Sequence, residues 1–133
     1  MRILCIVNPA AGGGRAARRW PALAAGLAQR GLRVETAVTR AAGEARRIAG
    51  RARDGGYRAV VAVGGDGTLH EVINGLLGGG QRPNALAPLP PIGWIPLGTG
   101  NDFAHAVGLG GSQRAILDAI AAGNWRSIDL GVV

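Results

Sequence analysis

The chain alternates short apolar runs with segments in which apolar residues recur every three to four positions. Runs of the first kind predict buried β-strands at residues 2–8, 32–39, 57–63 and 92–98. Segments of the second kind predict helices near residues 15–30, 43–53, 68–77 and 112–123. Strands that alternate with helices are typical of parallel βαβ units. The pattern therefore predicts an α/β fold, a three-layer Rossmann-like domain with a mostly parallel sheet, and a further strand within residues 124–133.

Capping residues and prolines indicate where the helices begin and end. Ser112 is a suitable N-cap for the last helix and Gly123 a suitable end. Thr68 and Glu71 have the spacing of a capping box, which predicts that the third helix begins at Thr68. Pro21 fits poorly inside a helix, so we expect the first helix to kink there or to begin near that residue.

The charge of the chain favours an anionic partner. All 15 basic residues are arginine, and with 8 acidic residues the formal net charge is +7. Nucleotides, phospholipid headgroups and nucleic acids are the usual partners of such a surface. Aromatic residues make up only 4% of the chain and do not interleave with the arginines, so we expect no nucleic acid partner.

The remaining composition argues for an intracellular setting. Cys5 is the single cysteine, so no disulfide framework is expected, and its apolar surroundings predict a small buried side chain. The apolar run at the start is too short for a signal peptide, and no run approaches the length of a membrane span. We therefore expect a cytoplasmic protein.

Three turns rich in glycine follow the first, third and fourth predicted strands. They read "NPAAGGG" (8–14), "GGDGT" (64–68) and "GTGND" (98–102). Turns at the carboxyl ends of parallel strands share one edge of the sheet. Glycine lets backbone N–H groups approach a phosphate closely, and a following helix adds a favourable dipole. The three turns together predict a phosphate-binding site.

Asp66 lies inside the second of these turns and has two possible roles. Two residues before the predicted cap at Thr68, its carboxylate is not needed for capping, and aspartate is common in solvated turns. Alternatively, it organises the phosphate site through backbone bonds or through the hydration shell of Mg²⁺, which takes few carboxylates and keeps its waters. We favour the second interpretation.

A competing motif lies at the first turn. Gly12-x-Gly14-x-x-Ala17 satisfies the dinucleotide-binding fingerprint, and Glu35 lies roughly where an acid that binds the ribose is expected. Four residues nevertheless separate the strand from the first glycine, and Glu35 falls inside the second strand. A Walker A motif is excluded, because it requires a lysine.

The motifs "VNPAAGG", "GGDGTLHEVINGL" and "IPLGTGNDFA", in this order, resemble the catalytic domain of diacylglycerol kinases. This family includes bacterial lipid kinases and their sphingosine and ceramide kinase relatives. NAD kinases share the GGDGT turn, so the resemblance implies the N-terminal domain of the NAD kinase/diacylglycerol kinase-like fold. It also implies ATP and Mg²⁺ as cofactors and transfer of the γ-phosphoryl group to a lipid hydroxyl such as that of diacylglycerol. The alternative is an NAD kinase-like protein or a non-catalytic nucleotide- or dinucleotide-binding module.

The resemblance also implies the residues of the nucleotide site. Asp66 takes the catalytic role, and no residue is assigned as a direct metal ligand. The residues implied to bind the nucleotide are Asn8, Pro9, Ala10, Ala11, Gly12, Thr39, Gly64, Gly65, Asp66, Gly67, Thr68, Leu69, His70 and Thr99. His70 departs from the family pattern, because many members carry asparagine there.

The family pairs this domain with a second, β-rich domain that carries acidic catalytic residues and much of the lipid site. We therefore expect residues 1–133 to be one nucleotide-binding domain of a longer protein. Its basic helices are either solvated faces or a peripheral contact with anionic lipid at the inner membrane surface. An unfinished sheet edge at the C-terminus further suggests a homodimer.

Overall fold

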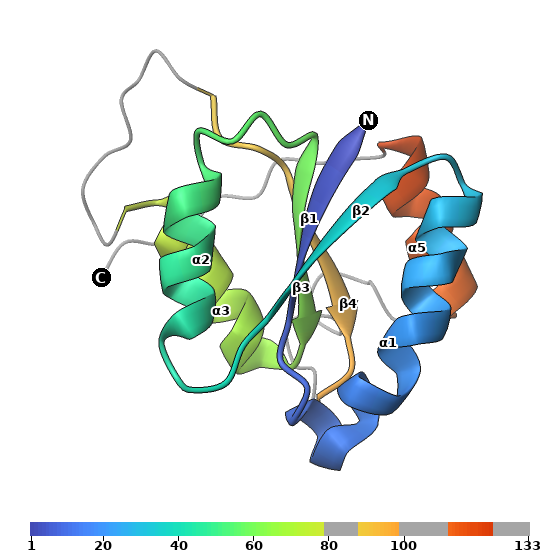
Figure 1. Cartoon of the computed structure of the whole chain (residues 1–133), viewed down its shortest axis with the longest axis horizontal. Helices are drawn as coiled ribbons and strands as arrows, with labels where there is room; N and C mark the ends of the chain where they lie inside the picture. Colours follow the sequence, from blue (N-terminus) through green and yellow to red (C-terminus); the bar gives the residue numbers. More distant parts are fainter. Residues whose placement is uncertain (79–87, 99–111, 124–133) are drawn as a thin grey trace.

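The computed structural model describes residues 1–78, 88–98 and 112–123, and it confirms the α/β fold. Within these residues, four strands, all parallel, form one sheet in the order β2-β1-β3-β4 (Figure 1). The strands are β1 (Arg2–Val7), β2 (Arg33–Val38), β3 (Ala59–Gly64) and β4 (Ile92–Pro96). The helices are α1 (Ala11–Gln29), α2 (Glu44–Ala52), α3 (Asp66–Leu76) and α5 (Gln113–Ala122). The strand predicted within 124–133 lies outside the described residues.

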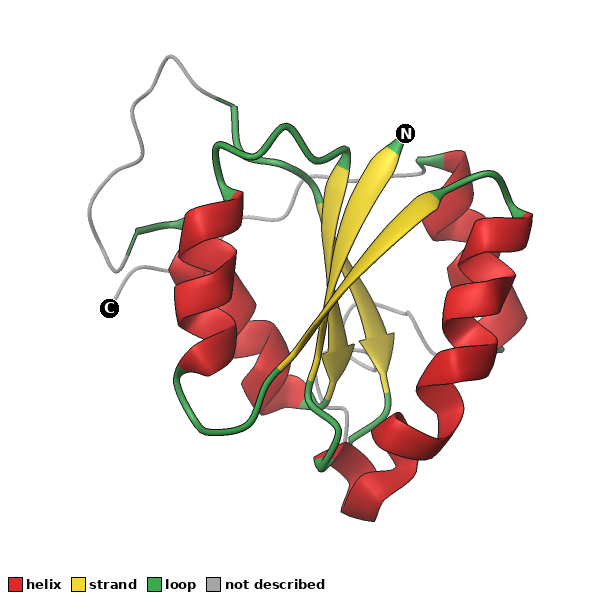
Figure 2. Ribbon diagram, viewed as in Figure 1, coloured by secondary structure: helices red, strands yellow, loops and turns green. Residues whose placement is uncertain are grey.

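Helices cover both faces of the sheet, which gives the predicted three layers. Figure 2 shows α2 and α3 on one side of the strands and α1 and α5 on the other. Because side chains alternate along a strand, β1 contributes to both cores. Ile3, Cys5 and Val7 pack toward α1 and α5, whereas Leu4 and Ile6 pack toward α2 and α3. A continuous apolar strand buried on both faces is the pattern expected of a parallel sheet.

Helices α2 and α3 pack against each other without room for a side chain at one point. A Cβ atom added to Gly75 would lie 2.2 Å from the carbonyl oxygen of Arg46 and 2.8 Å from the Cβ of Ala49. Leu69, Val72 and Leu76 of α3 are buried against the sheet, as the apolar stripe predicts. Close packing at Gly75 therefore fixes how α2 lies on α3.

The start of α1 differs from the prediction based on Pro21. The helix runs through Pro21 to Gln29. The irregularity lies earlier, at residues 12–14, where three consecutive glycines have φ of 63°, 67° and 92°. These left-handed conformations favour glycine, which has no Cβ atom to clash with the backbone. Pro21 is tolerated because it and Ala17, whose carbonyl loses its usual N–H partner, both lie on the exposed side of the helix.

The last described helix and the cysteine agree with the sequence. Ser112 caps α5 by accepting a hydrogen bond from the Ala115 N–H at 3.2 Å, and Gly123 ends the helix in the left-handed conformation. Cys5 is fully buried, and burial raises the pKa of its thiol to about 12. Across residues 1–78, 88–98 and 112–123, none of the helices has both the length and the apolar character needed to cross a membrane.

Candidate nucleotide-binding site

A cavity of about 750 Å³ opens at the carboxyl edge of the sheet. The β1–α1, β2–α2 and β3–α3 connections line it, together with Gly98 after β4. The glycine turns that follow β1 and β3 therefore meet at one edge with Gly98, as the sequence predicts, whereas residues 99–102 of the third turn lie outside the described residues. The last residue of β2 and the β2–α2 connection, residues 38–42 together, add a further wall.

The first turn is fastened to its neighbours by backbone contacts. The Asn8 N–H donates to the carbonyl of Val63 at 3.0 Å, and the Asn8 side-chain oxygen accepts from the Ala10 N–H at 3.2 Å. A Cβ atom at Gly12 would lie 2.2 Å from the carbonyl oxygen of Leu97, so only glycine fits there. These contacts hold the turn close to the ends of β3 and β4, at one wall of the cavity.

The capping-box prediction for α3 is wrong. The helix begins at Asp66, Gly65 is the N-cap, and no side chain bonds the cap. Thr68 lies within the first turn and is buried, because its side chain packs on Gly64, where an added Cβ would lie 2.6 Å from the Thr68 hydroxyl oxygen. The Thr68 side chain therefore makes a tertiary contact and does not cap the helix. Asp66 instead stands in the first helical turn, where the dipole favours a negative group.

The turns after β3 and β4 are held against each other at Gly64. Its carbonyl accepts the Leu97 N–H at 2.9 Å and the indole N–H of Trp94 at 3.1 Å. A Cβ atom at Gly65 would lie 3.2 Å from the Cα of Gly98. The lack of side chains at this junction leaves main chain facing the cavity, next to the N-terminal turn of α3. Amide groups in such a position suit an anion.

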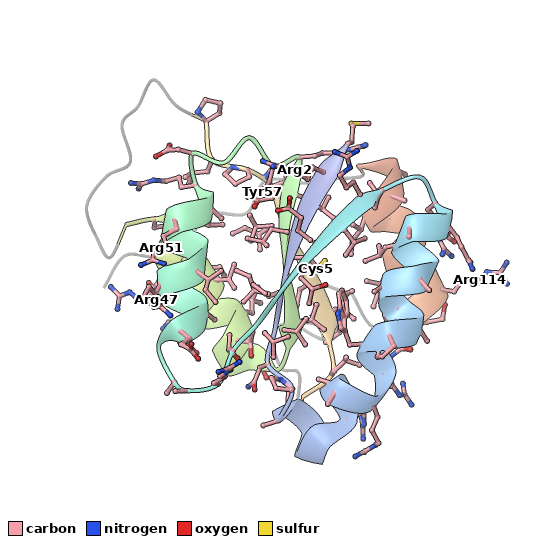
Figure 3. The ribbon with its side chains drawn as sticks, in the orientation of Figure 1. Arg2, Cys5, Arg47, Arg51, Tyr57 and Arg114 are labelled. Atoms are coloured by element: carbon pink, nitrogen blue, oxygen red, sulfur yellow. The ribbon has the colours of Figure 1, made fainter. Side chains whose placement is uncertain are left out.

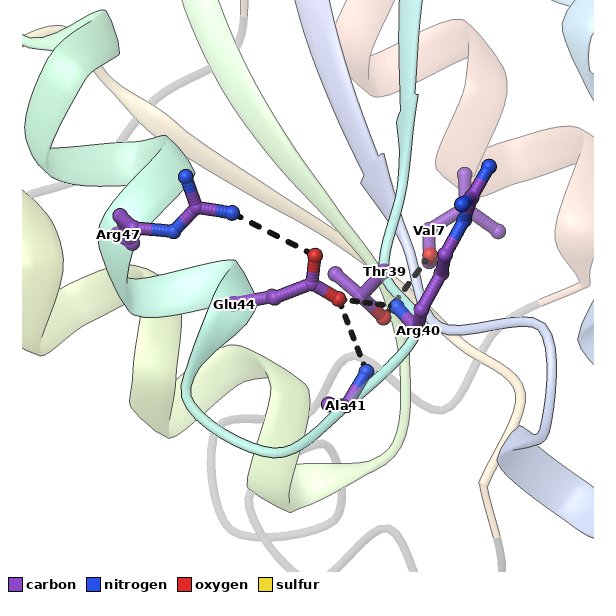
Figure 4. A network of polar contacts seen from close by, with 6 residues as sticks. All are labelled: Val7, Thr39, Arg40, Ala41, Glu44 and Arg47. Atoms are coloured by element: carbon purple, nitrogen blue, oxygen red, sulfur yellow. Dashed lines mark hydrogen bonds and ion pairs between the residues drawn. The ribbon is translucent and has the colours of Figure 1, made fainter.

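Two hydrogen-bond acceptors, the carbonyl of Val7 and the carboxylate of Glu44, order the β2–α2 connection (Figure 4). Thr39 is buried, and both its N–H and its hydroxyl donate to the carbonyl of Val7, at 2.9 and 3.3 Å. The carboxylate of Glu44 accepts from the N–H groups of Arg40 and Ala41 and pairs with Arg47 at 3.4 Å. The Arg40 N–H bond above all, aided by the Ala41 N–H and the charge of Arg47, holds the pKa of Glu44 below its ordinary value.

Ten of the residues implied to bind nucleotide line the cavity. They are Asn8, Pro9, Ala10, Ala11, Gly12, Thr39, Gly65, Asp66, Gly67 and Thr68. Gly64 is buried behind the junction, and Leu69 packs in the core. His70 is exposed on α3 outside the lining, and Thr99 lies outside the described residues. The binding and catalytic roles of these residues stay predictions.

Glu71 lines the cavity and was missed by the sequence reasoning, which assigned it to a capping box. Its Oε1 atom is buried and has no hydrogen-bond partner in the described part of the chain. The sequence does indicate that Glu71 lies on the same helix as Asp66. The spacing of the two residues alone, however, does not show which way the Glu71 side chain points. Among the described residues no group of three or more acidic, histidine or cysteine side chains is arranged to hold a metal.

Glu35 lies away from the cavity, at the side of the sheet where β1 begins. Its carboxylate accepts a hydrogen bond from the Tyr57 hydroxyl at 2.6 Å and pairs with Arg2 at 3.5 Å. The Arg2 guanidinium stacks on the ring of Tyr57, 4.4 Å from its centroid, and Figure 3 shows the two side chains together near the start of β1. Glu35 therefore does not serve as the ribose acid of a dinucleotide site, because it sits in a structural cluster remote from the glycine turns.

A model of the family described as the diacylglycerol kinase catalytic domain matches residues 2–133. The chain belongs to the diacylglycerol kinase catalytic domain family. A diacylglycerol kinase from Staphylococcus saprophyticus is 35% identical over 130 residues, which cover 98% of this chain and 40% of the relative. The Staphylococcus aureus (strain MRSA252) diacylglycerol kinase is also 35% identical over 130 residues, covering 98% of this chain and 39% of that relative.

Solved structures give the same family. A crystal structure described as a diacylglycerol kinase from Bacillus anthracis str. Sterne aligns with a TM-score of 0.74 and 27% identity, covering 92% of this chain and 42% of that one. The chain thus spans about two fifths of the length of the curated diacylglycerol kinases it matches. The matched residues include both described glycine turns that line the cavity, and Gly98.

Proposed function

We propose that this chain is the ATP-binding domain of a lipid kinase of the diacylglycerol kinase family. The observation that carries the proposal is the convergence of the glycine turns after β1 and β3, and of Gly98 after β4, on one cavity, with Asp66 in the first turn of α3. Family membership supports a kinase over a dinucleotide-binding protein, and the position of Glu35 removes the residue on which the dinucleotide alternative depended.

The residues fit Mg²⁺ bound together with a nucleotide. Mg²⁺ uses one or two carboxylates, phosphate oxygens and several waters, and Asp66 supplies a carboxylate beside the main chain expected to hold phosphates. When bound, the ion would neutralise charge on the phosphates. The amide groups around Gly12, Gly65 and Gly98 would orient the triphosphate, and Asp66 would hold a water or the ion in place.

In the proposed reaction, a lipid hydroxyl oxygen bonds to the γ-phosphorus while the bond between that phosphorus and the β–γ bridging oxygen breaks. ADP leaves, and the hydroxyl proton passes to a base that we place outside this chain. Such transfers depend on positioning and charge stabilisation more than on covalent chemistry by the protein. This domain would therefore contribute the binding and orientation of ATP.

Calorimetric titration of the chain with ATP, with and without Mg²⁺, tests the proposal. We expect Mg²⁺ to strengthen binding and Asp66→Asn to abolish that strengthening, because the neutral amide removes the charge that attracts the ion. Asp54→Asn is the matched control, since Asp54 is exposed and lies outside the cavity lining. Equal magnesium dependence in Asp66→Asn and wild type would refute the role of Asp66. A folded chain that binds no ATP would refute the function itself.

We further propose that the basic face of α2 contacts anionic lipid, with the protein cytoplasmic and peripheral at the inner membrane surface. Arg46, Arg47 and Arg51 are exposed on this helix, and Figure 3 shows Arg47 and Arg51 pointing away from the sheet. Co-sedimentation with vesicles of neutral and of anionic lipid tests this. Arg51→Glu should reduce binding to anionic vesicles, whereas Arg114→Glu on α5, also exposed, should not. Equal sedimentation with both vesicle types would overturn the proposal.

We also propose a homodimer through an open sheet edge. The C-terminal edge expected from the sequence lies outside the described residues, and β2 offers a candidate edge within them. Within the described residues, β2 pairs with β1 on one side only, and its outer edge offers main-chain groups to another strand. Sedimentation equilibrium over a range of protein concentrations tests this, because a dimer dissociates on dilution. A single species with the mass of one chain at every concentration would overturn it.

A further inference from the structure

A second groove lies between α2 and α3. It measures about 330 Å³ and shares no lining residue with the cavity at the glycine turns. Its lining consists of Gly43, Arg46, Arg47 and Gly50 of α2 and its cap, and of Gly75 and Gly78 at the end of α3. Positions 43, 46, 47 and 50 have the spacing of one helix face. Because the other four lining residues are glycines, the two arginines supply every side chain of the groove.

Gly50 is the glycine of this groove that neither backbone conformation nor packing explains. Gly43 and Gly78 have φ of 87° and 74°, which favours glycine. Gly75 has no room for a Cβ atom beside the Arg46 carbonyl. Gly50, in contrast, lies within α2 at an ordinary φ, and a Cβ there would meet only the Gly75 carbonyl oxygen, at 3.5 Å. Glycine within a helix is less stable than alanine, so what Gly50 provides is open space beside the arginines.

The groove is also positively charged. Arg46 is exposed, and the ion pairs among the described residues do not include it. Arg47 pairs with Glu44 at 3.4 Å, yet its side chain is 53% exposed. The Glu44 carboxylate also accepts main-chain N–H groups from the β2–α2 connection and does not line the groove. Two guanidinium groups therefore remain able to donate to an anion.

The lining indicates which anion fits. The groove offers no apolar side chain to an acyl chain or to an aromatic ring, so the anionic group itself must be what is recognised. Guanidinium groups bind phosphate oxygens through paired N–H donors. A phosphate monoester carries up to two charges and three terminal oxygens, which is enough for both arginines. A diester has one charge and two such oxygens, and it suits the pair less well.

We propose that the groove between α2 and α3 is a second anion site, which binds a phosphate monoester through Arg46 and Arg47. Gly50 leaves the space in which the phosphate reaches both guanidinium groups. The monoester is either the headgroup of a lipid such as phosphatidate or a soluble phosphate ester. This site does not depend on the binding of ATP. In the lipid case it adds a specific headgroup to the contact proposed for α2.

The test titrates the isotope-labelled chain with glycerol 3-phosphate, a soluble monoester, and follows the backbone amide signals by NMR. The signals of Gly50, Gly75 and Gly78 should shift saturably, because these residues line the groove. Dimethyl phosphate, a diester, should bind more weakly. In Arg46→Gln the affinity for glycerol 3-phosphate should fall about tenfold or more, as expected for lost hydrogen bonds to a charged group. Arg51→Gln is the matched control, since it removes the same charge from an exposed position of α2 outside the lining and should weaken binding less.

Gly50→Leu separates the shape of the groove from its charge. This variant fills the groove and keeps every arginine, so it should lose glycerol 3-phosphate binding without a change in net charge. If Gly50→Leu does not fold, Arg46→Gln at its exposed position decides the question. Equal losses in Arg46→Gln and Arg51→Gln would overturn the proposal, because they would show attraction without a site. Unshifted groove signals in wild type, or full affinity in folded Gly50→Leu, would overturn it as well.

Co-sedimentation with vesicles then identifies the source of the monoester. Vesicles that contain phosphatidate are compared with phosphatidylglycerol vesicles of the same zeta potential. A preference for phosphatidate that Arg46→Gln and Gly50→Leu abolish assigns the groove to a lipid headgroup. Equal binding to both vesicles, with glycerol 3-phosphate binding intact, assigns it to a soluble ester. Arg46→Gln should bind ATP as wild type does, because the groove and the cavity share no lining residue. Failure of this site would therefore leave the proposed function standing.

Discussion

We expect that Gly75 cannot be replaced by a larger residue, because the added side chain would clash with a backbone atom of α2. In Gly75→Ala the new Cβ would lie 2.2 Å from the Arg46 carbonyl oxygen, which cannot rotate away as a side chain would. Overpacking a tight interior costs about 1–3 kcal/mol, and we place this contact at the upper end because α2 itself must move. Alanine also gains about 1 kcal/mol over glycine in a helix interior. The expected net loss is therefore about 2 kcal/mol of the free energy of unfolding.

Gly50→Ala on α2 is the matched control. An added Cβ at Gly50 would lie 3.5 Å from the carbonyl oxygen of Gly75, which is an ordinary contact. The helix gain should then dominate, so Gly50→Ala should equal or exceed wild type in stability. Urea unfolding followed by circular dichroism measures both variants. The reasoning is refuted if Gly75→Ala is as stable as wild type, or if Gly50→Ala loses as much stability as Gly75→Ala.

Three further predictions concern single side chains. Cys5 should resist thiol reagents at neutral pH and react only on unfolding, because burial raises its pKa to about 12 and the thiolate is the reactive form; rapid labelling of the folded chain would contradict this. Ser112→Ala should lower the free energy of unfolding by about 1 kcal/mol, measured by urea unfolding, because the N-cap of α5 is lost. Ala115→Ser, at an exposed position, is the control because it leaves the cap in place. The pKa of Glu44 lies below its ordinary value, so its carboxylate stabilises the fold above the unfolded pKa and this contribution disappears as pH falls through the folded pKa. Stability curves of wild type and Glu44→Gln should accordingly converge in acid and separate at neutral pH, and parallel curves would exclude that linkage.

The sequence predicted the fold and the edge of the sheet at which the cavity lies, because both depend on strong local signals. Apolar runs, helical spacing and glycine turns each recur along the chain, and parallel strands bring every such turn to one edge. The errors arose where tertiary contacts override a local pattern. Thr68 has the spacing of a capping residue, yet it packs on Gly64 and leaves the helix to begin at Asp66.

The same limitation explains Glu71 and Glu35. A helical pattern separates buried from exposed positions, but it does not distinguish a polar residue that faces solvent from one that faces a cavity between two helices. Glu71 belongs to the second kind because α2 approaches α3 closely at Gly75. Glu35 satisfied a spacing rule for a ribose ligand, whereas its contacts with Tyr57 and Arg2 depend on strand pairing that spacing does not encode.

The cavity can form only late in synthesis of the chain, because its walls come from segments far apart in the sequence. Its walls come from residues 8–12, 38–42, 45, 65–68, 71 and 98, so the ribosome releases the first wall long before the last. Until β4 pairs with β3, the turn at Gly12 has no Leu97 carbonyl to pack against. A nascent chain therefore cannot form the cavity in its finished geometry. The nucleotide that we propose for this cavity would join segments from almost the whole described sequence. Ligand at a hundred times its Kd would add about 2.7 kcal/mol to the stability of the sheet as a unit.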